Sequence, residues 1–455
     1  MSKPQLPQGT RDFSAAVVQR RQYIFQNIRS VFELYGFQPL ETPAMENLDT
    51  LMGKYGDEGD KLIFKILNNG LDNPTKLASA TAGFEKVLAG KSSADLTERA
   101  LRYDLTIPFA RYVAMNQGQL VFPFKRYQIQ PVWRADRPQK GRYREFTQCD
   151  CDMVGSKSLL NEVELLHIYA TVFNRLGLEV EIQINHRSIL SALAEVCGGP
   201  HLLTAITTAI DKIDKIGLEK VQSELLNAGL SENSIQIITQ YLQLEGTHQQ
   251  KMDSLAMLTQ DHPLMLAGAA DLTYLHQMGP WPAGVQVVTK PTLARGLNYY
   301  TGTIFEVKAL HAAMGSIGGG GRYDDLTGLF DVPGIPGGGI SFGVDRIYDV
   351  LEQLQLFPES VASGTKVLFV NLGAEESAVA YAAMQSIRQK GIASEIYPDA
   401  VKLDKQFKYA DKKSIPYAII IGSNEMLEGV CKIKNLITGN QETISIASLP
   451  DHPFQ

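Results

Sequence analysis

The sequence of 455 residues predicts an α+β core, a helical insertion and a C-terminal α/β domain. Apolar residues follow both helix and strand spacing up to residue 190, mainly helix spacing over 191–285, and alternating strand and helix segments after residue 365. A typical domain has about 150 residues, so the length of the chain also indicates three parts. We expect a core of residues 1–190 and 286–357, an insertion at 191–285 and a final domain at 366–455.

The core elements follow from local patterns. Val17, Ile24 and Ile28 are spaced as on a helix over residues 14–35, Gly36 ends it, and a short strand follows up to Pro43. The remaining core elements are a strand end running into a helix at 102–116, two strands at 122–136 and 144–155 around a basic turn, a helix at 161–177, strands at 179–185, 284–290 and 301–309, and a strand feeding a helix at 338–354.

The insertion and the last domain have different patterns. Residues 202–217 and 232–246 have periodic apolar positions and few strand signals, which predicts helices. Residues 357–365 are rich in Ser, Pro and Gly, which is typical of a linker. Strand-like segments at 366–372, 392–397 and 416–422 alternate with helical ones, which predicts a β-α-β-α-β domain.

Composition limits the function classes. Hydrophobic residues make up 44% of the chain, charged residues 20%, and the net charge is −6. These values exclude a disordered chain, a disulfide scaffold and a globally basic nucleic-acid binder, but not a local basic patch. Four cysteines in a chain of this size indicate a reducing compartment. The sequence has no apolar run as long as about 18 residues, and the N-terminal segment has no apolar run of a signal peptide. We therefore expect a cytoplasmic protein without a membrane segment.

Residues 125–144 are strongly basic. They hold seven Lys or Arg residues against one acid, Asp136, with Trp133 and Tyr143 among them. Guanidinium groups bind phosphate oxygens and aromatic rings stack on bases, so this hairpin suits a polyphosphate or nucleic acid. A solvated basic loop remains the alternative.

Two glycine-rich segments carry weaker signals. Residues 317–330 contain four consecutive glycines, which favours either a flexible turn or close approach of the backbone to a ligand. Gly339, Ser341 and Gly343 match the G-x-S-x-G pattern of hydrolases. That reading is rejected because only His452 follows Ser341 in the chain. The eight histidines are scattered without ligand spacing, so no protein metal motif is expected.

Taken together, these segments resemble class II aminoacyl-tRNA synthetases, and among them the histidyl-tRNA synthetase family. The resemblance covers nearly the whole chain. It rests on PQGTRDF (7–13), YGFQPLETP (35–43, similar to motif 1), RYDLTIPFARY (102–112), VWRADRPQKGRYREFTQCDCDMVG (132–155, similar to motif 2), RGLNYYTGTIFE (295–306), GGGRYDDL (319–326) and GISFGVDRI (339–347, similar to motif 3). The last domain resembles an anticodon-binding domain.

The resemblance implies the class II synthetase fold, with a mostly antiparallel sheet, and a histidine–tRNA ligase. Such an enzyme activates histidine with ATP to histidyl-adenylate and pyrophosphate, and then transfers histidine to the 3′ end of its tRNA. It also implies ATP with Mg²⁺, tRNA(His), L-histidine and a homodimer. The implied catalytic residues are Arg134 and Arg295; ATP would be bound by Arg134, Asp136, Tyr143, Phe146 and Arg346; histidine by Asp104, Thr106, Gln148, Asp152, Arg295, Tyr299, Tyr300 and Tyr323; and the tRNA acceptor stem by Arg137, Gln139 and Lys140.

Three positions differ from the pattern of the family. Asn298 stands where Asp is usual, and Asp104 and Asp136 each stand where Glu is common. None of these changes removes a cation expected at the phosphates. The alternatives are a non-catalytic paralogue acting as regulatory subunit of ATP phosphoribosyltransferase, which would be expected to lack the last domain, and a class II synthetase for glycine, threonine or proline.

Overall fold

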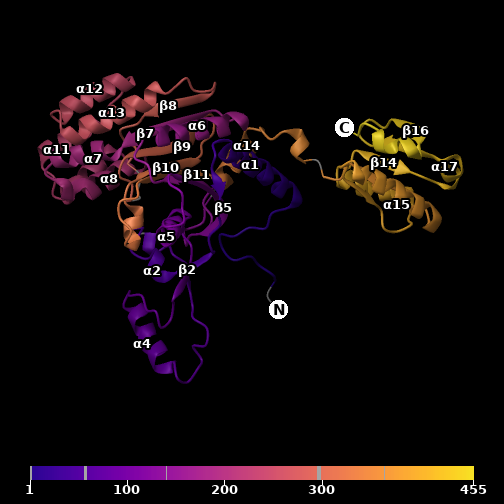
Figure 1. Cartoon of the computed structure of the whole chain (residues 1–455), viewed down its shortest axis with the longest axis horizontal. Helices are drawn as coiled ribbons and strands as arrows, with labels where there is room; N and C mark the ends of the chain where they lie inside the picture. Colours follow the sequence, from indigo (N-terminus) through magenta and orange to yellow (C-terminus); the bar gives the residue numbers. More distant parts are fainter. Residues whose placement is uncertain (1–2, 56–58, 140, 295–298, 363, 455) are drawn as a thin grey trace. The chain divides into compact units, whose positions relative to one another are not determined.

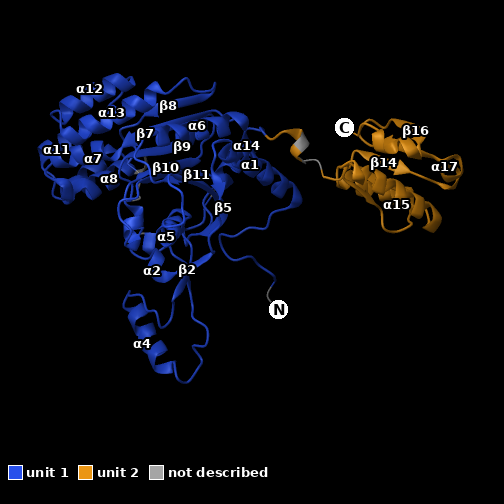
Figure 2. Cartoon of the chain, in the orientation of Figure 1, with its two compact units in different colours: residues 1–356 blue, residues 357–455 orange. Residues whose placement is uncertain are grey.

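A sheet of eight strands organises the first of the two units into which the chain divides, residues 1–356 and 357–455 (Figure 2). The computed structural model describes residues 3–55, 59–139, 141–294, 299–362 and 364–454. All neighbouring strands are antiparallel except two pairs, β1–β5 and β7–β8, which confirms the mostly antiparallel sheet. In spatial order the strands are β1 (Gln38–Pro39), β5 (Phe124–Trp133), β6 (Glu145–Val154), β11 (Gly337–Gly343), β10 (Gly318–Tyr323), β9 (Thr303–Ala309), β7 (Val180–His186) and β8 (Val285–Thr289).

Helices α1 (Ala15–Leu34), α6 (Leu160–Arg175) and α14 (Val344–Gln353) pack against this sheet (Figure 1). Phe342 on β11 contacts both Tyr169 of α6 and Phe32 of α1, with ring centroids 4.8 and 5.8 Å apart. Because side chains alternate along a strand, Ser341 and Gly343 point to the opposite face of the sheet. The three helices thus bury one face, and the polar side chains of β6 and β11 occupy the other.

The hairpin of β5 and β6 agrees with the two strands expected around the basic turn. Its register pairs Phe124 with Val154 and Trp133 with Glu145.

The four consecutive glycines, in contrast, form no turn. Gly318 to Gly321 are part of the buried central strand β10, which pairs with both β9 and β11. Glycine disfavours strands on propensity alone, so the pairing on both sides decides the conformation here.

A smaller sheet, β2 (Met45–Asn47), β4 (Arg99–Leu101) and β3 (Lys65–Ile66), lies beside helices α2 (Leu48–Leu51) and α5 (Thr106–Asn116). Helix α4 (Leu77–Leu88) lies beyond this sheet in Figure 1. Leu48, Ile107 and Phe109 share a core with Tyr323 at the end of β10. This core fixes the loop before α5, which carries Asp104, against the large sheet.

The stretch from Arg187 to Gln277 is helical, as expected for the insertion, and contains no strand among its described residues. Helix α7 packs on α13, and α12 and α13 lie over β8 and β7. The insertion boundaries at 191 and 285 stay a prediction. The helices are α7 (Arg187–Val196), α8 (Leu203–Asp211), α9 (Ile213–Ile216), α10 (Leu218–Asn227), α11 (Glu232–Leu242), α12 (His248–Leu258) and α13 (Pro263–Gln277), with a 3₁₀ turn at Pro200–Leu202.

Two histidines, one on α12 and one on α13, pack together beside β8. The rings of His248 and His276 lie 4.2 Å apart, and both bond to Thr289 Oγ1 at 2.8 Å. Burial, His248 and Lys251 lower the pKa of His276 to about 4 from its ordinary 6.5. Burial and Lys251 also lower the pKa of His248. The folded protein therefore holds His276 neutral at a pH at which the unfolded chain binds a proton.

This difference predicts acid destabilisation. As the pH falls from about 6.5 towards 4, unfolding takes up a proton, so the free energy of unfolding should decrease; above pH 6.5 the effect should vanish. Melting temperatures at pH 7.5 and pH 5 should differ less in His276→Gln than in the unsubstituted protein. An identical pH dependence in both would show that His276 does not contribute.

The second unit contains a five-stranded sheet in the order β13-β12-β14-β15-β16. The first three strands are parallel and alternate with helices, as expected, whereas β15 and β16 form an antiparallel hairpin that the sequence pattern did not reveal. The elements are β12 (Val367–Phe369), α15 (Ala374–Gln389), β13 (Ser394–Ile396), α16 (Leu403–Lys412), β14 (Tyr417–Ile420), α17 (Ser423–Glu428), β15 (Val430–Asn435) and β16 (Gln441–Ser445), with 3₁₀ turns at Glu359–Ala362 and Ile446–Asp451.

Candidate active site

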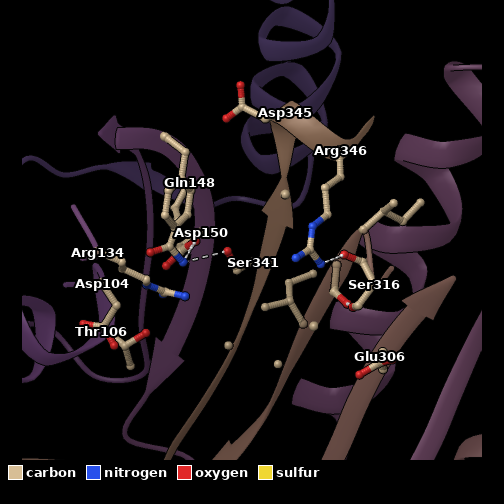
Figure 3. Close-up of a pocket in the computed structure, with 18 of the residues that line it drawn as sticks. Asp104, Thr106, Arg134, Gln148, Asp150, Glu306, Ser316, Ser341, Asp345 and Arg346 are labelled. Atoms are coloured by element: carbon tan, nitrogen blue, oxygen red, sulfur yellow. Dashed lines mark hydrogen bonds between the residues drawn. The ribbon is translucent and has the colours of Figure 1, made fainter. Parts of the chain in front are cut away.

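One pocket lies on the polar face of the large sheet (Figure 3). It is lined from β6, β9, β10 and β11, from the start of α14 and from the loop before α5. The structure gathers here all the described residues predicted to bind ATP or histidine, although they come from positions 104 to 346 of the chain: Asp104, Thr106, Arg134, Asp136, Tyr143, Phe146, Gln148, Asp152, Tyr299, Tyr300, Tyr323 and Arg346. Arg295 and Asn298 lie outside the described residues.

The floor of the pocket is made of backbone. A Cβ on Gly339 of β11 would collide with the carboxylate of Asp152 on the neighbouring strand. A Cβ on Gly321 of β10 would lie 2.5 Å from the carbonyl oxygen of Thr303 and 2.8 Å from the ring of Tyr300. Only glycine permits this approach. The glycine-rich segments therefore let the Asp152 carboxylate and the Tyr300 ring pack directly against the backbone of the sheet.

One end of the pocket is cationic. Arg134, just after β5, donates from Nε to the carbonyl oxygen of Tyr103 at 3.0 Å, and its guanidinium lies 5.1 Å from the ring of Phe146. Arg346, in the first turn of α14, donates to the carbonyl oxygens of Gly141 at 2.9 Å and Ser316 at 2.6 Å. Burial lowers the pKa of Arg346, and the nearby cations Arg142 and Arg134 add to this effect. Cations gathered against their mutual repulsion indicate a site for a polyanion.

The N-terminal segment stabilises this end. Arg11 and Arg21 both pair with Asp345, the neighbour of Arg346, and the Arg11 guanidinium lies 3.2 Å from the ring centroid of Tyr143. The Arg144 amide donates to the carbonyl oxygen of Gly9 at 2.9 Å. Segments similar to motifs 2 and 3 are thus joined through PQGTRDF, a role for this segment that the sequence alone did not reveal.

The opposite end presents hydrogen-bond acceptors. Asp104 is 3% exposed, and its Oδ1 accepts from Tyr55 Oη at 2.9 Å and from the Ile107 amide at 3.1 Å. Burial raises the pKa of Asp104, while the Ile107 amide, Arg134 and Tyr55 lower it. Such a fixed carboxylate suits a ligand ammonium group.

Asp152 forms a second buried acceptor. Its Oδ1 accepts from Tyr323 Oη at 2.6 Å, and its Oδ2 lies 2.8 Å from Nη2 of Arg126, which is fully buried behind it. Burial raises the pKa of Asp152, whereas Arg126 and Tyr323 lower it. Burial and Asp152 raise the pKa of Tyr323 well above its ordinary range, so its hydroxyl keeps its proton and donates.

The described residues predicted to meet the acceptor stem do not line this pocket. Arg137 and Gln139 are not among the residues that line the pocket, and Lys140 lies outside the described part of the chain. Gln139 pairs with Arg142 as an isolated bridge, and Arg142 Nε lies 3.1 Å from Asp136. Asp136 thus pairs with Arg142 of the same loop and also lines the pocket.

Several residues in or behind the site were not predicted from the sequence, among them Tyr55, Arg126, Asp150 and Ser341. Asp150 was detectable, since Gln148, Asp150 and Asp152 alternate along one strand and must share a face. Ser341 was considered only as a nucleophile. Arg126 was counted in the basic run but is 0% exposed, and nothing local in the sequence marks Tyr55 as a partner of Asp104.

Comparisons with known proteins relate nearly the whole chain to one family. The histidyl-tRNA synthetase family model matches residues 92–347, more than half of the chain, and the anticodon binding domain model matches residues 366–452. The chain is 51% identical over 452 residues to the histidine–tRNA ligase of Bacteroides fragilis strain YCH46, covering 98% of each chain. It is 50% identical over 469 residues to that of Flavobacterium johnsoniae, again covering 98% of each. The crystal structure of histidyl-tRNA synthetase from Nostoc sp. PCC 7120 superposes with a TM-score of 0.79 at 28% identity, covering 99% of each chain. The chain belongs to the histidyl-tRNA synthetase family.

Proposed function

We propose that this chain is a histidine–tRNA ligase that forms histidyl-adenylate from histidine and ATP and then esterifies the 3′ end of tRNA(His). The observation that carries the proposal is a single pocket with cations at one end and buried acceptors at the other. The full-length relatives named histidine–tRNA ligase support it.

The cationic end suits the activation step. The carboxylate of histidine attacks the α-phosphorus of ATP, and pyrophosphate leaves. Negative charge grows on the α-phosphate oxygens in the transition state, so cations held there in advance lower the barrier. Arg134 would hold the α-phosphate, with Arg295 as the second cation. Phe146 would stack on adenine, and Arg346 would cover its other face and reach the γ-phosphate. Asp136 and Tyr143 would complete the ATP site.

The acceptor end suits histidine. Asp104, Thr106 and Gln148 would bind the α-ammonium group, and Asp152 with Tyr299, Tyr300 and Tyr323 would surround the imidazole. Fixed hydrogen-bonding groups reject apolar analogues strongly because such a ligand leaves buried polar atoms unpaired. Tyr323 donates its hydroxyl proton to Asp152, so both side chains present acceptors to the ring and suit its N–H groups.

Mg²⁺ is proposed to enter with ATP. Among the described residues, no three His, Cys, Asp or Glu side chains lie together as a metal site. When bound, Mg²⁺ would neutralise phosphate charge, and we assign no residue of the chain to hold it.

The tRNA contacts divide between the units. Arg137, Gln139 and Lys140 of the basic loop would meet the acceptor stem, and the domain at 366–455 would read the anticodon. The catalytic core would comprise residues 1–190 and 286–357, with 191–285 as the insertion.

We also propose a homodimer through the segment similar to motif 1, and a cytoplasmic location. No single helix in the described ranges meets the length and hydropathy needed to cross a membrane; one pair bent by 119°, Arg187–Val196 with Pro200–Asp211, meets them only jointly.

Histidine-dependent exchange of pyrophosphate into ATP tests the proposal. The purified protein should catalyse exchange with histidine and not with glycine, threonine or proline. A folded protein without histidine-dependent exchange would instead favour the regulatory-subunit alternative. That alternative is less supported, because the last domain is present and relatives of full length are named as ligases.

A further inference from the structure

The side-chain amide of Gln148 has one atom unused. Gln148 is on β6 and is 9% exposed. Its Nε2 donates to Ser341 Oγ at 3.0 Å and makes a longer contact of 3.5 Å with Asp150 Oδ1. Its Oε1 is buried and has no hydrogen-bond partner among the described residues. A buried carbonyl oxygen without a partner costs stability, so an acceptor kept in this state indicates a donor that arrives with the ligand.

The two neighbours determine which way the amide faces. Asp150 lies directly opposite Ser341 in the β6–β11 register, and the Ser341 hydroxyl bonds to the Asp150 carboxylate. An ionised carboxylate only accepts, so the Ser341 proton points to Asp150 and its lone pairs face Gln148. Nε2 of Gln148 must then face Ser341, and Oε1 must face away. The three side chains appear together in Figure 3.

We propose that Asp150 and Ser341 are positioning residues that lock the Gln148 amide, so that its Oε1 accepts a hydrogen bond from the α-ammonium group of the amino acid substrate. This inference rests on the proposed function. It gives Asp150 a role that is separate from that of Asp152, although both carboxylates lie on the same face of β6.

Charge around Asp150 makes the lock sensitive to pH. Burial raises its pKa to about 7; Arg126 on β5 and Ser341 on β11 lower it, and Asp152 on β6 and Asp104 before α5 raise it. Above pH 7 the ionised carboxylate keeps the Ser341 proton in place. Below pH 7 the protonated carboxyl group can donate to Ser341, whose own proton is then free to bond Oε1 of Gln148.

Two soluble probes separate recognition of the ammonium group from the integrity of the pocket. Histidinol carries the ammonium and imidazole groups, whereas 3-(imidazol-4-yl)propionate carries the imidazole without the ammonium. Calorimetry at pH 8 without ATP should show that Asp150→Asn weakens histidinol binding about tenfold. The asparagine can donate to Ser341, which allows the Gln148 amide to turn its NH₂ towards the ammonium. Binding of the propionate should change less than twofold.

Ser341→Ala provides a second variant with little risk to folding, and it should show the same selective loss. The matched control is Cys149→Ala on the same strand, with its side chain buried on the opposite face; it should leave the ratio of the two affinities unchanged. The inference would be overturned, with the proposed function intact, if Asp150→Asn and Ser341→Ala both lost equal affinity for the two probes. It would likewise be overturned if neither variant lost affinity for histidinol. Failure of the unsubstituted protein to bind either probe would overturn the proposed function together with the inference.

Discussion

Arg134→Ala is expected to slow histidine-dependent pyrophosphate exchange about 100- to 1,000-fold in kcat, the usual cost of removing one group that stabilises transition-state charge. The KM for ATP should rise far less, because the α-phosphate carries less charge before attack. Stopped-flow or exchange kinetics at varied ATP concentration will separate the two parameters.

Arg134→Lys tests whether charge alone suffices. Lysine keeps the cation but lacks Nε, which donates to the Tyr103 carbonyl oxygen at 3.0 Å, and lacks the planar group near Phe146. An intermediate rate is expected. Arg175→Ala, a surface change on α6, is the control and should have no effect. If Arg134→Ala raised KM for ATP without lowering kcat, Arg134 would act only in ground-state binding.

Arg126→Met should be the most destabilising change in the pocket. Arg126 is fully buried, lies 2.8 Å from Asp152 and packs 4.3 Å from the ring of Phe109. Removing one member of a buried ion pair leaves the other charge uncompensated and costs about 3–5 kcal/mol. The pKa of Asp152 should rise further, and affinity for the imidazole should fall with it. The urea midpoint of the full chain measures the stability change.

A double-mutant cycle provides the control for this prediction. Asp152→Asn removes the charge that Arg126 balances, so Arg126→Met combined with Asp152→Asn should be more stable than Arg126→Met alone. Strictly additive losses would show that packing against Phe109, and not the ion pair, determines the contribution of Arg126.

Local patterns predicted the elements that carry most of the site. Strands at 122–136 and 144–155 and a helix at the end of 338–354 were expected from the sequence, and the structure places Arg134, Gln148 and Arg346 on or beside them. The predicted ligand roles of these residues came from the family resemblance and stay predictions until the variants are measured.

Other parts of the structure depend on contacts that no local window contains. Gly318 to Gly321 form a central strand because β9 and β11 pair on both sides. Arg126 reads as one more residue of a basic run, yet it is buried by Phe109 and Asp152 from other segments. The small sheet and α4 between residues 45 and 101 carry no motif and were not predicted from the sequence.

The backbone floor beneath Asp152 and Tyr300 limits how this site can be altered. Glycine is already the smallest residue, so no substitution at Gly339 can deepen the pocket, and a Cβ there would collide with the Asp152 carboxylate, as one on Gly321 would with the Thr303 carbonyl oxygen. A bulkier amino acid could gain room only if the aromatic walls were cut back, at Tyr300 or Tyr323. Of these two walls, Tyr323 also supplies the hydroxyl that bonds Asp152. Enlarging the pocket at Tyr323 would therefore weaken discrimination at the same time, whereas a change at Tyr300 would leave that hydroxyl in place.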